Sequence, residues 1–176
     1  MDSVLLLGKV LMTDTTTKDS KHIAELVSDA KVAMLTTMTV DGQHVSRPMG
    51  LQEAEFDGDL WFFAYEQSAK VAQVKVNPAV NVSFSNDKNS SWTSITGRAE
   101  IVHDRHKAEE LYTPTLKAWF PDGVDTEGIT LIKIHADSAE YWEGPSSTVG
   151  FALGTLRAAV TKNPDNDPIT NKTVQL

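Results

Sequence analysis

Apolar and polar residues alternate along several short stretches of the chain, and this period of two predicts β-strands. Val80, Val82 and Phe84 give the clearest example, with polar residues between them. Five further strands are expected over residues 32–38, 44–53, 60–65, 92–102 and 131–142. Tight hairpin turns are favoured at Asp41-Gly42 and Asp57-Gly58, which separate the first three strands. The pattern therefore predicts six antiparallel strands joined largely by tight turns.

Two residues mark irregular places in these strands. Pro48 lacks an N–H donor, so its strand is expected to be an edge strand, bulged or locally unpaired there. Gly97 lies inside the predicted fifth strand, where a glycine is typical of a bulge or a bend. Six short strands of this kind favour a closed or nearly closed barrel, because closure removes exposed strand edges.

Helical spacing of apolar residues marks four other segments. They are residues 20–27, which Ser20 would cap, 68–76, which Asn77-Pro78 would end, 104–112, which Asp104 would cap, and 149–160. A further helical turn is expected over residues 115–120, whereas residues 161–176 are polar, contain two prolines and predict a loose tail. The expected fold class is mainly β with α (α+β): a six-stranded antiparallel barrel with flanking helices.

The composition excludes several classes of protein. The 176 residues suit one domain, and a net charge of -8 argues against a general nucleic-acid binder, which needs a basic surface. The absence of cysteine removes disulfides, thiolate nucleophiles and cysteine-based metal sites, and it fits a reduced cytoplasm. The apolar run Val4–Leu7 is too short to span a membrane. We expect a cytoplasmic protein whose partners include neither nucleic acid nor membrane.

The most informative chemistry lies in two segments that adjacent strands would bring together. One contains Ser46 and Arg47 on the predicted second strand, and the other contains Ser68 and Lys70 at the start of a predicted helix. A phosphate monoester suits such a set, because arginine, lysine, hydroxyls and free helix N–H groups all bind it. The alternative is that Arg47 and Lys70 are ordinary solvated surface cations.

Aromatic residues and histidines are less decisive. The aromatic residues are Trp61, Phe62, Phe63, Trp92, Trp119, Phe120, Tyr141 and Trp142, among others. They could line a flat pocket for a ring system, or they could belong to the core and to an interface. The histidines are scattered and predict no metal site, and the pair His103 and His106 fits a surface helix start. No nucleophile elbow and no glycine-rich phosphate loop occur, so no catalytic residue is identified.

Three motifs together resemble the pyridoxamine 5'-phosphate oxidase-like superfamily of FMN-binding split barrels. They are Ser46-Arg47-Pro48-Met49, the run from Phe62 to Lys70, and Glu140-Tyr141-Trp142-Glu143-Gly144. Within the superfamily the sequence is most similar to the general stress protein 26 group. The resemblance implies an N-terminal extension (1–20), an FMN-binding split-barrel domain (21–144), and a C-terminal helix and tail (145–176).

The resemblance also implies roles for individual residues. Arg47, Ser68 and Lys70 would hold the FMN phosphate, in a strand where Ser46, Pro48 and Met49 also lie against the cofactor. Met49, Phe63 and Ala64 would run along the flavin, and Trp92 and Trp142 would lie near its ring. In the family the flavin is bound between subunits, so a homodimer is implied, with Trp142 reaching the flavin of the other subunit.

Departures from the family pattern modify the functional expectation. Ala69 stands where the true oxidases carry an arginine, and Trp92 stands where a flavin-contacting glutamine is usual. After Trp142, Gly144-Pro145-Ser146-Ser147 replaces the Arg-x-His that grips the substrate. We therefore expect a general-stress-type FMN protein that does not oxidise pyridoxamine phosphate.

Three functions stay open from the sequence. The first is a flavin-dependent oxidoreductase of unknown substrate, with a nicotinamide as candidate reductant. The second is a non-catalytic flavin-binding stress or sensor protein. The third is a barrel that holds another cofactor, such as haem or a deazaflavin.

Overall fold

One antiparallel β-sheet organises the chain. The structure is a computed structural model, and it describes residues 18–30, 32–50, 56–145 and 169–176. The strands are β1 (Val32–Met38), β2 (His44–Gly50), β3 (Asp59–Tyr65), β4 (Ala79–Asn86), β5 (Ser91–Val102), β6 (Ile129–Glu143) and β7 (Thr170–Gln175). Together with the helices they confirm the α+β class, although the sheet has seven strands and not six.

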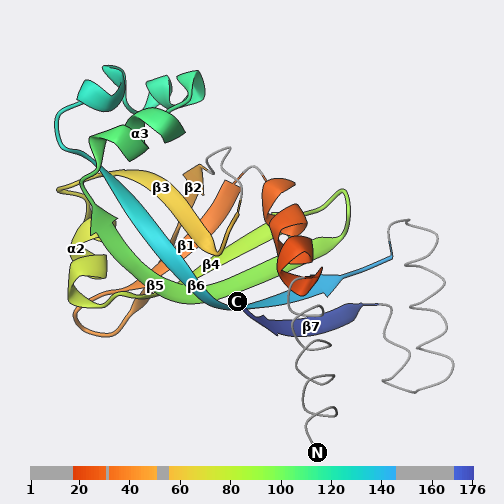
Figure 1. Ribbon diagram of the computed structural model, residues 1–176. Helices are drawn as coiled ribbons and strands as arrows, with labels where there is room; N and C mark the ends of the chain where they lie inside the picture. Colours follow the sequence, from red (N-terminus) through yellow and green to blue (C-terminus); the bar gives the residue numbers. More distant parts are fainter. Residues whose placement is uncertain (1–17, 31, 51–55, 146–168) are drawn as a thin grey trace, which may run out of the picture.

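The strands follow the order β2-β1-β4-β5-β6-β3. β6 is long enough to pair with two strands along the same edge, with β3 over residues 129–135 and with β7 over residues 138–143. β2 and β3 occupy the two ends of the path, and no pairing joins them in the described parts of the chain. The sequence favoured a closed or nearly closed barrel; the sheet is strongly curved but not closed (Figure 1).

Both irregular strand residues lie where the sequence indicated. Pro48 is on β2, which within the described residues pairs with β1 alone and so is an edge strand. Gly97 lies at a bulge, because the pairing with β6 shifts from Thr96–Ser138 to Gly97–Ala136. A Cβ atom at Gly97 would lie 2.2 Å from the backbone oxygen of His135, so the close approach of the two strands requires a glycine.

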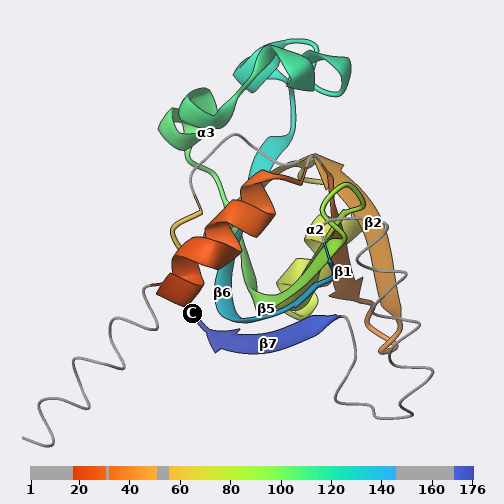
Figure 2. The same ribbon diagram turned by 90° about the vertical axis from the view of Figure 1, so that its right-hand side faces the viewer.

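Two helices pack against the main core of the curved sheet. The N-terminal helix is described over residues 18–28 and lies on the concave side of the sheet (Figure 2). Ile23 and Val27 of this helix are buried, and the helix already includes residues 18–20, so the expected N-cap at Ser20 is wrong. Helix α2 (Ala69–Val76) inserts Val71 and Val74 into the same core.

A second, smaller layer lies beyond the ends of β5 and β6. It contains α3 (Arg105–Leu111) and two short 3-10 helices, η1 (Pro114–Ala118) and η2 (Gly123–Asp125). Asp104 caps α3 as predicted, since its side chain accepts a hydrogen bond of 3.0 Å from the N–H of Lys107. This layer encloses its own apolar cluster around Phe63, Leu111 and Phe120. None of the helices described here is long and apolar enough to cross a membrane.

The C-terminal end of the chain differs most from the structure expected from the sequence. The expected loose tail contains β7, whose Val174 is only 5% exposed and belongs to the main core. Four predicted segments lie outside the described residues: tail residues 161–168, the helix over 149–160, most of the N-terminal extension (1–17) and the strand end over 51–53. The second strand is described as far as Gly50.

Candidate functional site

Arg47 is held in a fixed orientation on the concave side of the sheet. It lies opposite Leu35 in the β1–β2 pairing, and Leu35 is fully buried. Its Nη1 donates to the backbone oxygen of Leu35 at 3.2 Å and to Oγ1 of Thr37 at 2.6 Å, and its Nη2 donates to Oε1 of Gln73 at 2.9 Å. These bonds use three of the five N–H donors of the guanidinium, so two donors remain for a ligand.

Arg47 and Lys70 both lack a counter-ion among the described residues. In the described parts of the chain, no carboxylate forms an ion pair with Arg47 or with Lys70. Burial lowers the pKa of Arg47, and burial followed by the charge of Arg47 lowers the pKa of Lys70. Two partly buried like charges that act on each other create a local demand for an anion.

Ser68 supplies an unused polar group beside these cations. It is the N-cap residue of α2, with φ −74° and ψ 150°, yet its side chain makes no capping hydrogen bond. Its Oγ is buried and has no hydrogen-bond partner. Leaving such a group unpaired costs about 1–3 kcal/mol, so a bound acceptor would be favoured there. Ser68 lies two residues before Lys70, and the charge of Lys70 interacts with that of Arg47, so the three residues remain candidates for holding an anion.

The other residues predicted in the phosphate-binding strand divide between the two faces of β2. Ser46 and Pro48 are exposed on the convex side, where Ser46 Oγ lies 2.6 Å from Oγ1 of Thr36. Met49 is buried in the main core. The side chain of Met49 is thus directed away from solvent, so a ligand at the surface of the strand would meet its main chain first.

The two residues predicted along the flavin on β3 are also buried. Ala64 belongs to the main core, whereas Phe63 belongs to the cluster beneath α3. The ring of Phe63 packs against Tyr112 and Phe120, with centroid distances of 6.0 and 5.8 Å. Packing occupies both side chains, and this leaves their main chain as the part available to a ligand.

Trp92 and Trp142 are neighbours on the convex side of the sheet. They lie directly opposite each other in the β5–β6 pairing, and Trp92 is 37% exposed. The residues that follow or precede them, Thr93 and Tyr141, are buried on the concave side. A single chain therefore places the two tryptophans and Arg47 on opposite faces of the sheet and does not bring them together.

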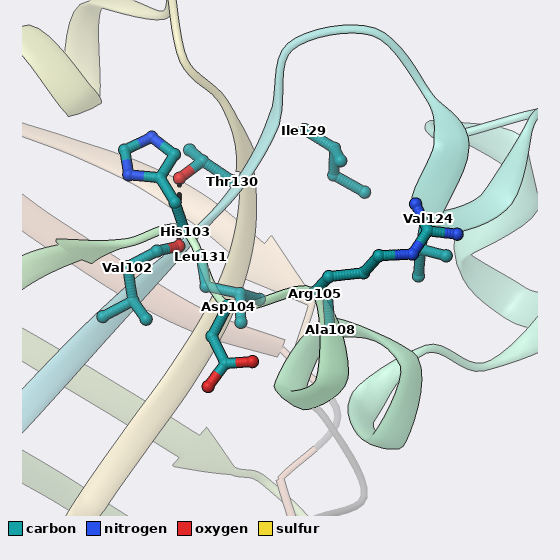
Figure 3. A pocket seen from close by; sticks show the side chains of 9 residues that line it. All are labelled: Val102, His103, Asp104, Arg105, Ala108, Val124, Ile129, Thr130 and Leu131. Atoms are coloured by element: carbon teal, nitrogen blue, oxygen red, sulfur yellow. Dashed lines mark hydrogen bonds between the residues drawn. The ribbon is translucent and has the colours of Figure 1, made fainter.

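A hollow of about 200 Å³ lies where β5, α3 and β6 meet (Figure 3). Its lining residues are Val102, His103, Asp104, Arg105, Ala108, Val124, Ile129, Thr130 and Leu131. Its charged groups are already engaged: His103 Nε2 lies 2.8 Å from a carboxylate oxygen of Glu66, and Arg105 pairs with Glu109 and Asp125. Figure 3 shows Arg105 extending across the hollow toward Val124. The Arg105 pairs stabilise α3 and join it to η2, whereas the His103–Glu66 contact joins the segments that follow β5 and β3.

A larger hollow of about 750 Å³ lies between the N-terminal helix and strands β6 and β7. Residues of both charge signs line it: Lys18, Asp19, Lys21, His22, Glu25, Tyr141 and Lys172. Lys172 is bound by both carboxylate oxygens of Asp19, and His22 contacts Glu143. These pairs connect the helix to the strands. Across the described residues, no group of three His, Asp or Glu side chains is arranged to hold a metal ion.

Comparison with known proteins identifies the family. A family profile described as "Pyridoxamine 5'-phosphate oxidase like" matches residues 18–166. The chain belongs to this family. The match covers the whole sheet except β7, and it includes the candidate phosphate site at Arg47, Ser68 and Lys70.

Individual relatives agree with this assignment. Protein bli-3 of Neurospora crassa is 30% identical over 152 residues, which cover 81% of this chain and 73% of that protein. Among solved structures, a protein from Jannaschia sp. CCS1 described as a general stress protein 26 has a TM-score of 0.70 at 22% identity, covering 90% of this chain and 99% of that one. An F420 reductase has a TM-score of 0.52 at 24% identity, covering 65% and 93%. The two structural matches support the fold.

Two residues of the site were missed by sequence reasoning. Thr37 lies in an apolar run and is 1% exposed, and Gln73 lies in the middle of α2. Nothing in the local pattern distinguishes them from ordinary strand and helix residues. Their contact with Arg47 depends on how α2 packs against β1, and only the fold reveals that.

Proposed function

We propose that this protein binds FMN and that Arg47, Ser68 and Lys70 hold the phosphate of the cofactor. The observation that carries the proposal is the pair of cations without a counter-ion beside a buried, unpartnered hydroxyl. Flavin binding is common in the family to which the chain belongs. When bound, FMN would supply redox chemistry at its ring, while the protein would orient it and control its surroundings.

The charge of the site supports a phosphate monoester. Such a group carries about −1.5 to −2 charges at pH 7 and offers three strong acceptor oxygens. Arg47 and Lys70 provide two positive charges, and Ser68 with the first free N–H groups of α2 provides neutral donors. The number of cations therefore matches one dianionic phosphate, even without the arginine that Ala69 replaces.

We further propose that the protein acts as a homodimer with the flavin at the interface. Val32, at 53%, and Met34, at 40%, are exposed on the same convex side of the sheet as Trp92. A second copy that covered this face would bury them, and it would bring tryptophans from one chain toward the cofactor of the other. This arrangement resolves the separation of Arg47 from Trp92 and Trp142 within one chain.

We also propose that the protein is cytoplasmic and acts as a flavin-dependent oxidoreductase of the general stress type. Hydride transfer to a flavin needs no side-chain acid or base, so the absence of an assigned catalytic residue is compatible with turnover. Gly144 and Pro145 follow the last long strand in place of charged substrate-binding groups. We therefore expect pyridoxamine phosphate not to be the substrate.

A deazaflavin is the second candidate cofactor, because one structural neighbour is an F420 reductase. The absorption spectrum of the purified protein separates the two cofactors, and stopped-flow reduction with NADH and NADPH separates an enzyme from a pure flavin binder. We expect one FMN per chain, a dimer by analytical ultracentrifugation, and reduction of the bound flavin by a nicotinamide. A protein that binds no flavin at micromolar concentrations would contradict the proposal.

A matched pair of arginine variants tests the phosphate contact. Arg47→Ala is expected to weaken FMN binding at least tenfold, because it removes a charge-assisted contact. Arg98→Ala is the control, since Arg98 is an exposed arginine on β5 that, among the described residues, pairs only with Asp137, at a long distance of 3.8 Å. Equal FMN affinity in both variants would refute the assignment of the phosphate to Arg47.

A further inference from the structure

Arg47, Thr37 and Gln73 form a closed triangle of hydrogen bonds. Arg47 donates to Thr37 Oγ1 at 2.6 Å and to Gln73 Oε1 at 2.9 Å. Thr37 in turn donates its hydroxyl to the same Gln73 oxygen at 2.6 Å. The three residues come from β2, β1 and α2, so the triangle joins the edge of the sheet to the helix that begins at the phosphate site.

Burial fixes the positions of the two supporting residues. Thr37 is 1% exposed and lies in register with Val45, one pair away from the pairing of Leu35 with Arg47 along the same face. Gln73 lies one turn beyond Ser68 and Lys70, between the buried residues Val71 and Val74 of α2. A guanidinium held in this way loses little further freedom when a ligand binds, which favours affinity.

All three acceptors of Arg47 are electrically neutral. They are the carbonyl of Leu35, the hydroxyl of Thr37 and the amide oxygen of Gln73. A carboxylate in any of these places would orient the guanidinium equally well, but it would also neutralise the charge. Neutral acceptors orient Arg47 and leave its full positive charge for an external anion.

We infer that Gln73 and Thr37 are positioning residues that make the site selective for a cofactor with a terminal phosphate over the same cofactor without it. The inference rests on the proposed FMN function. Discrimination between FMN and riboflavin then depends on Thr37 and Gln73, two residues that act through Arg47 and do not touch the phosphate. Arg47 supplies one of the two positive charges that the described residues bring to the site, so a change in its orientation or charge affects half of that charge.

The test compares the dissociation constants of FMN and riboflavin, measured by flavin fluorescence with full-length protein freed of any flavin. Gln73→Glu keeps the shape of the side chain and its acceptor atoms but adds a negative charge beside Arg47. We expect it to weaken FMN binding at least tenfold and to leave riboflavin binding within twofold of the unchanged protein. Gln73→Leu removes the acceptor and is expected to weaken FMN binding about tenfold.

Controls distinguish positioning from general damage to the fold. Gln175→Leu changes an exposed glutamine on β7 and should alter neither affinity. Urea unfolding of every variant identifies any that fails to fold, and the nearly isosteric Gln73→Glu then carries the test alone. Equal weakening of FMN and riboflavin by Gln73→Glu, or no weakening of FMN, would overturn the inference.

A double-mutant cycle separates this inference from the proposed function. If Gln73 acts through Arg47, then Gln73→Glu will cause no additional selective loss of FMN in an Arg47→Ala background. A full additional loss there would show that Gln73 acts independently of Arg47 and would overturn the positioning role. If Arg47→Ala alone leaves FMN binding intact, the phosphate assignment itself fails, and the positioning role fails with it.

Discussion

The bulge at Gly97 gives the sharpest prediction about the fold. In Gly97→Ala, the new Cβ would lie 2.2 Å from the carbonyl oxygen of His135 and 3.0 Å from its carbonyl carbon. Carbon and oxygen atoms approach each other to about 3.3 Å even in close strand contacts, so the two backbones must separate by about 1 Å. No flexible side chain can absorb this shift, because the nearest atoms belong to the backbone of β6.

The loss in the free energy of unfolding of Gly97→Ala can be worked out from the cost of overpacking. Crowding of this kind costs typically about 1–3 kcal/mol, whereas replacing a glycine by alanine without strain stabilises by about 0.4–1 kcal/mol through the unfolded chain. Gly50→Ala is the matched control, since Gly50 lies in the same sheet and its added Cβ would meet nothing within 4 Å. The two variants should differ by about 2 kcal/mol in the free energy of unfolding.

Urea and thermal unfolding of both variants measure this difference. For a chain of this length, about 2 kcal/mol corresponds to a separation of roughly 4–8 °C between the two midpoints, with Gly97→Ala the lower. Circular dichroism at the same time reports whether the sheet is retained. Equal midpoints for the two variants would refute the argument that strands β5 and β6 require a glycine at the bulge.

Three further predictions concern the tail, the cation pair and an acidic residue. Val174→Asp places a carboxylate at a site that is 5% exposed, and it should lower the urea midpoint and expose the C-terminus to proteolysis. Burial, followed by the charge of Arg47, lowers the pKa of Lys70. Because a bound phosphate favours the protonated lysine, FMN binding should take up protons at alkaline pH and weaken as pH rises. Calorimetry in buffers of different ionisation enthalpy measures this uptake. Hydrogen bonds from Lys75 and then His103 lower the pKa of Glu66, so this carboxylate stabilises the fold above its unfolded pKa and loses that effect as pH falls through the folded value. Glu66→Gln should therefore reduce stability at pH 6, and this loss should shrink as the pH falls through the folded pKa of Glu66.

Local signals in the sequence predicted most of the sheet. Pro48 indicated an edge strand and Gly97 indicated a bulge, because each residue has a backbone property that few environments tolerate. Asp104 predicted the start of α3 for a similar reason, since its side chain satisfies a free helix N–H group. Such signals depend on neighbours in sequence and can be interpreted without the fold.

Features that depend on distant contacts were not predictable. The tail strand β7 has no apolar alternation beyond Val174, and its pairing with the second half of β6 creates its structure. Closure of the barrel depends on whether β2 reaches β3, which no local pattern decides. Thr37 and Gln73 are functional candidates only because α2 packs beside β1 and places both next to Arg47.

Phosphorus-31 NMR of FMN bound to the protein tests the central claim most directly, because it observes the phosphate itself. The second pKa of a free phosphate monoester is about 6, so its resonance shifts as pH is lowered through that value. With Arg47 and Lys70 beside it, the bound phosphate should remain dianionic and its resonance should stay constant well below pH 6. A bound resonance that titrates like that of free FMN, or an apoprotein that binds no FMN, would contradict the account.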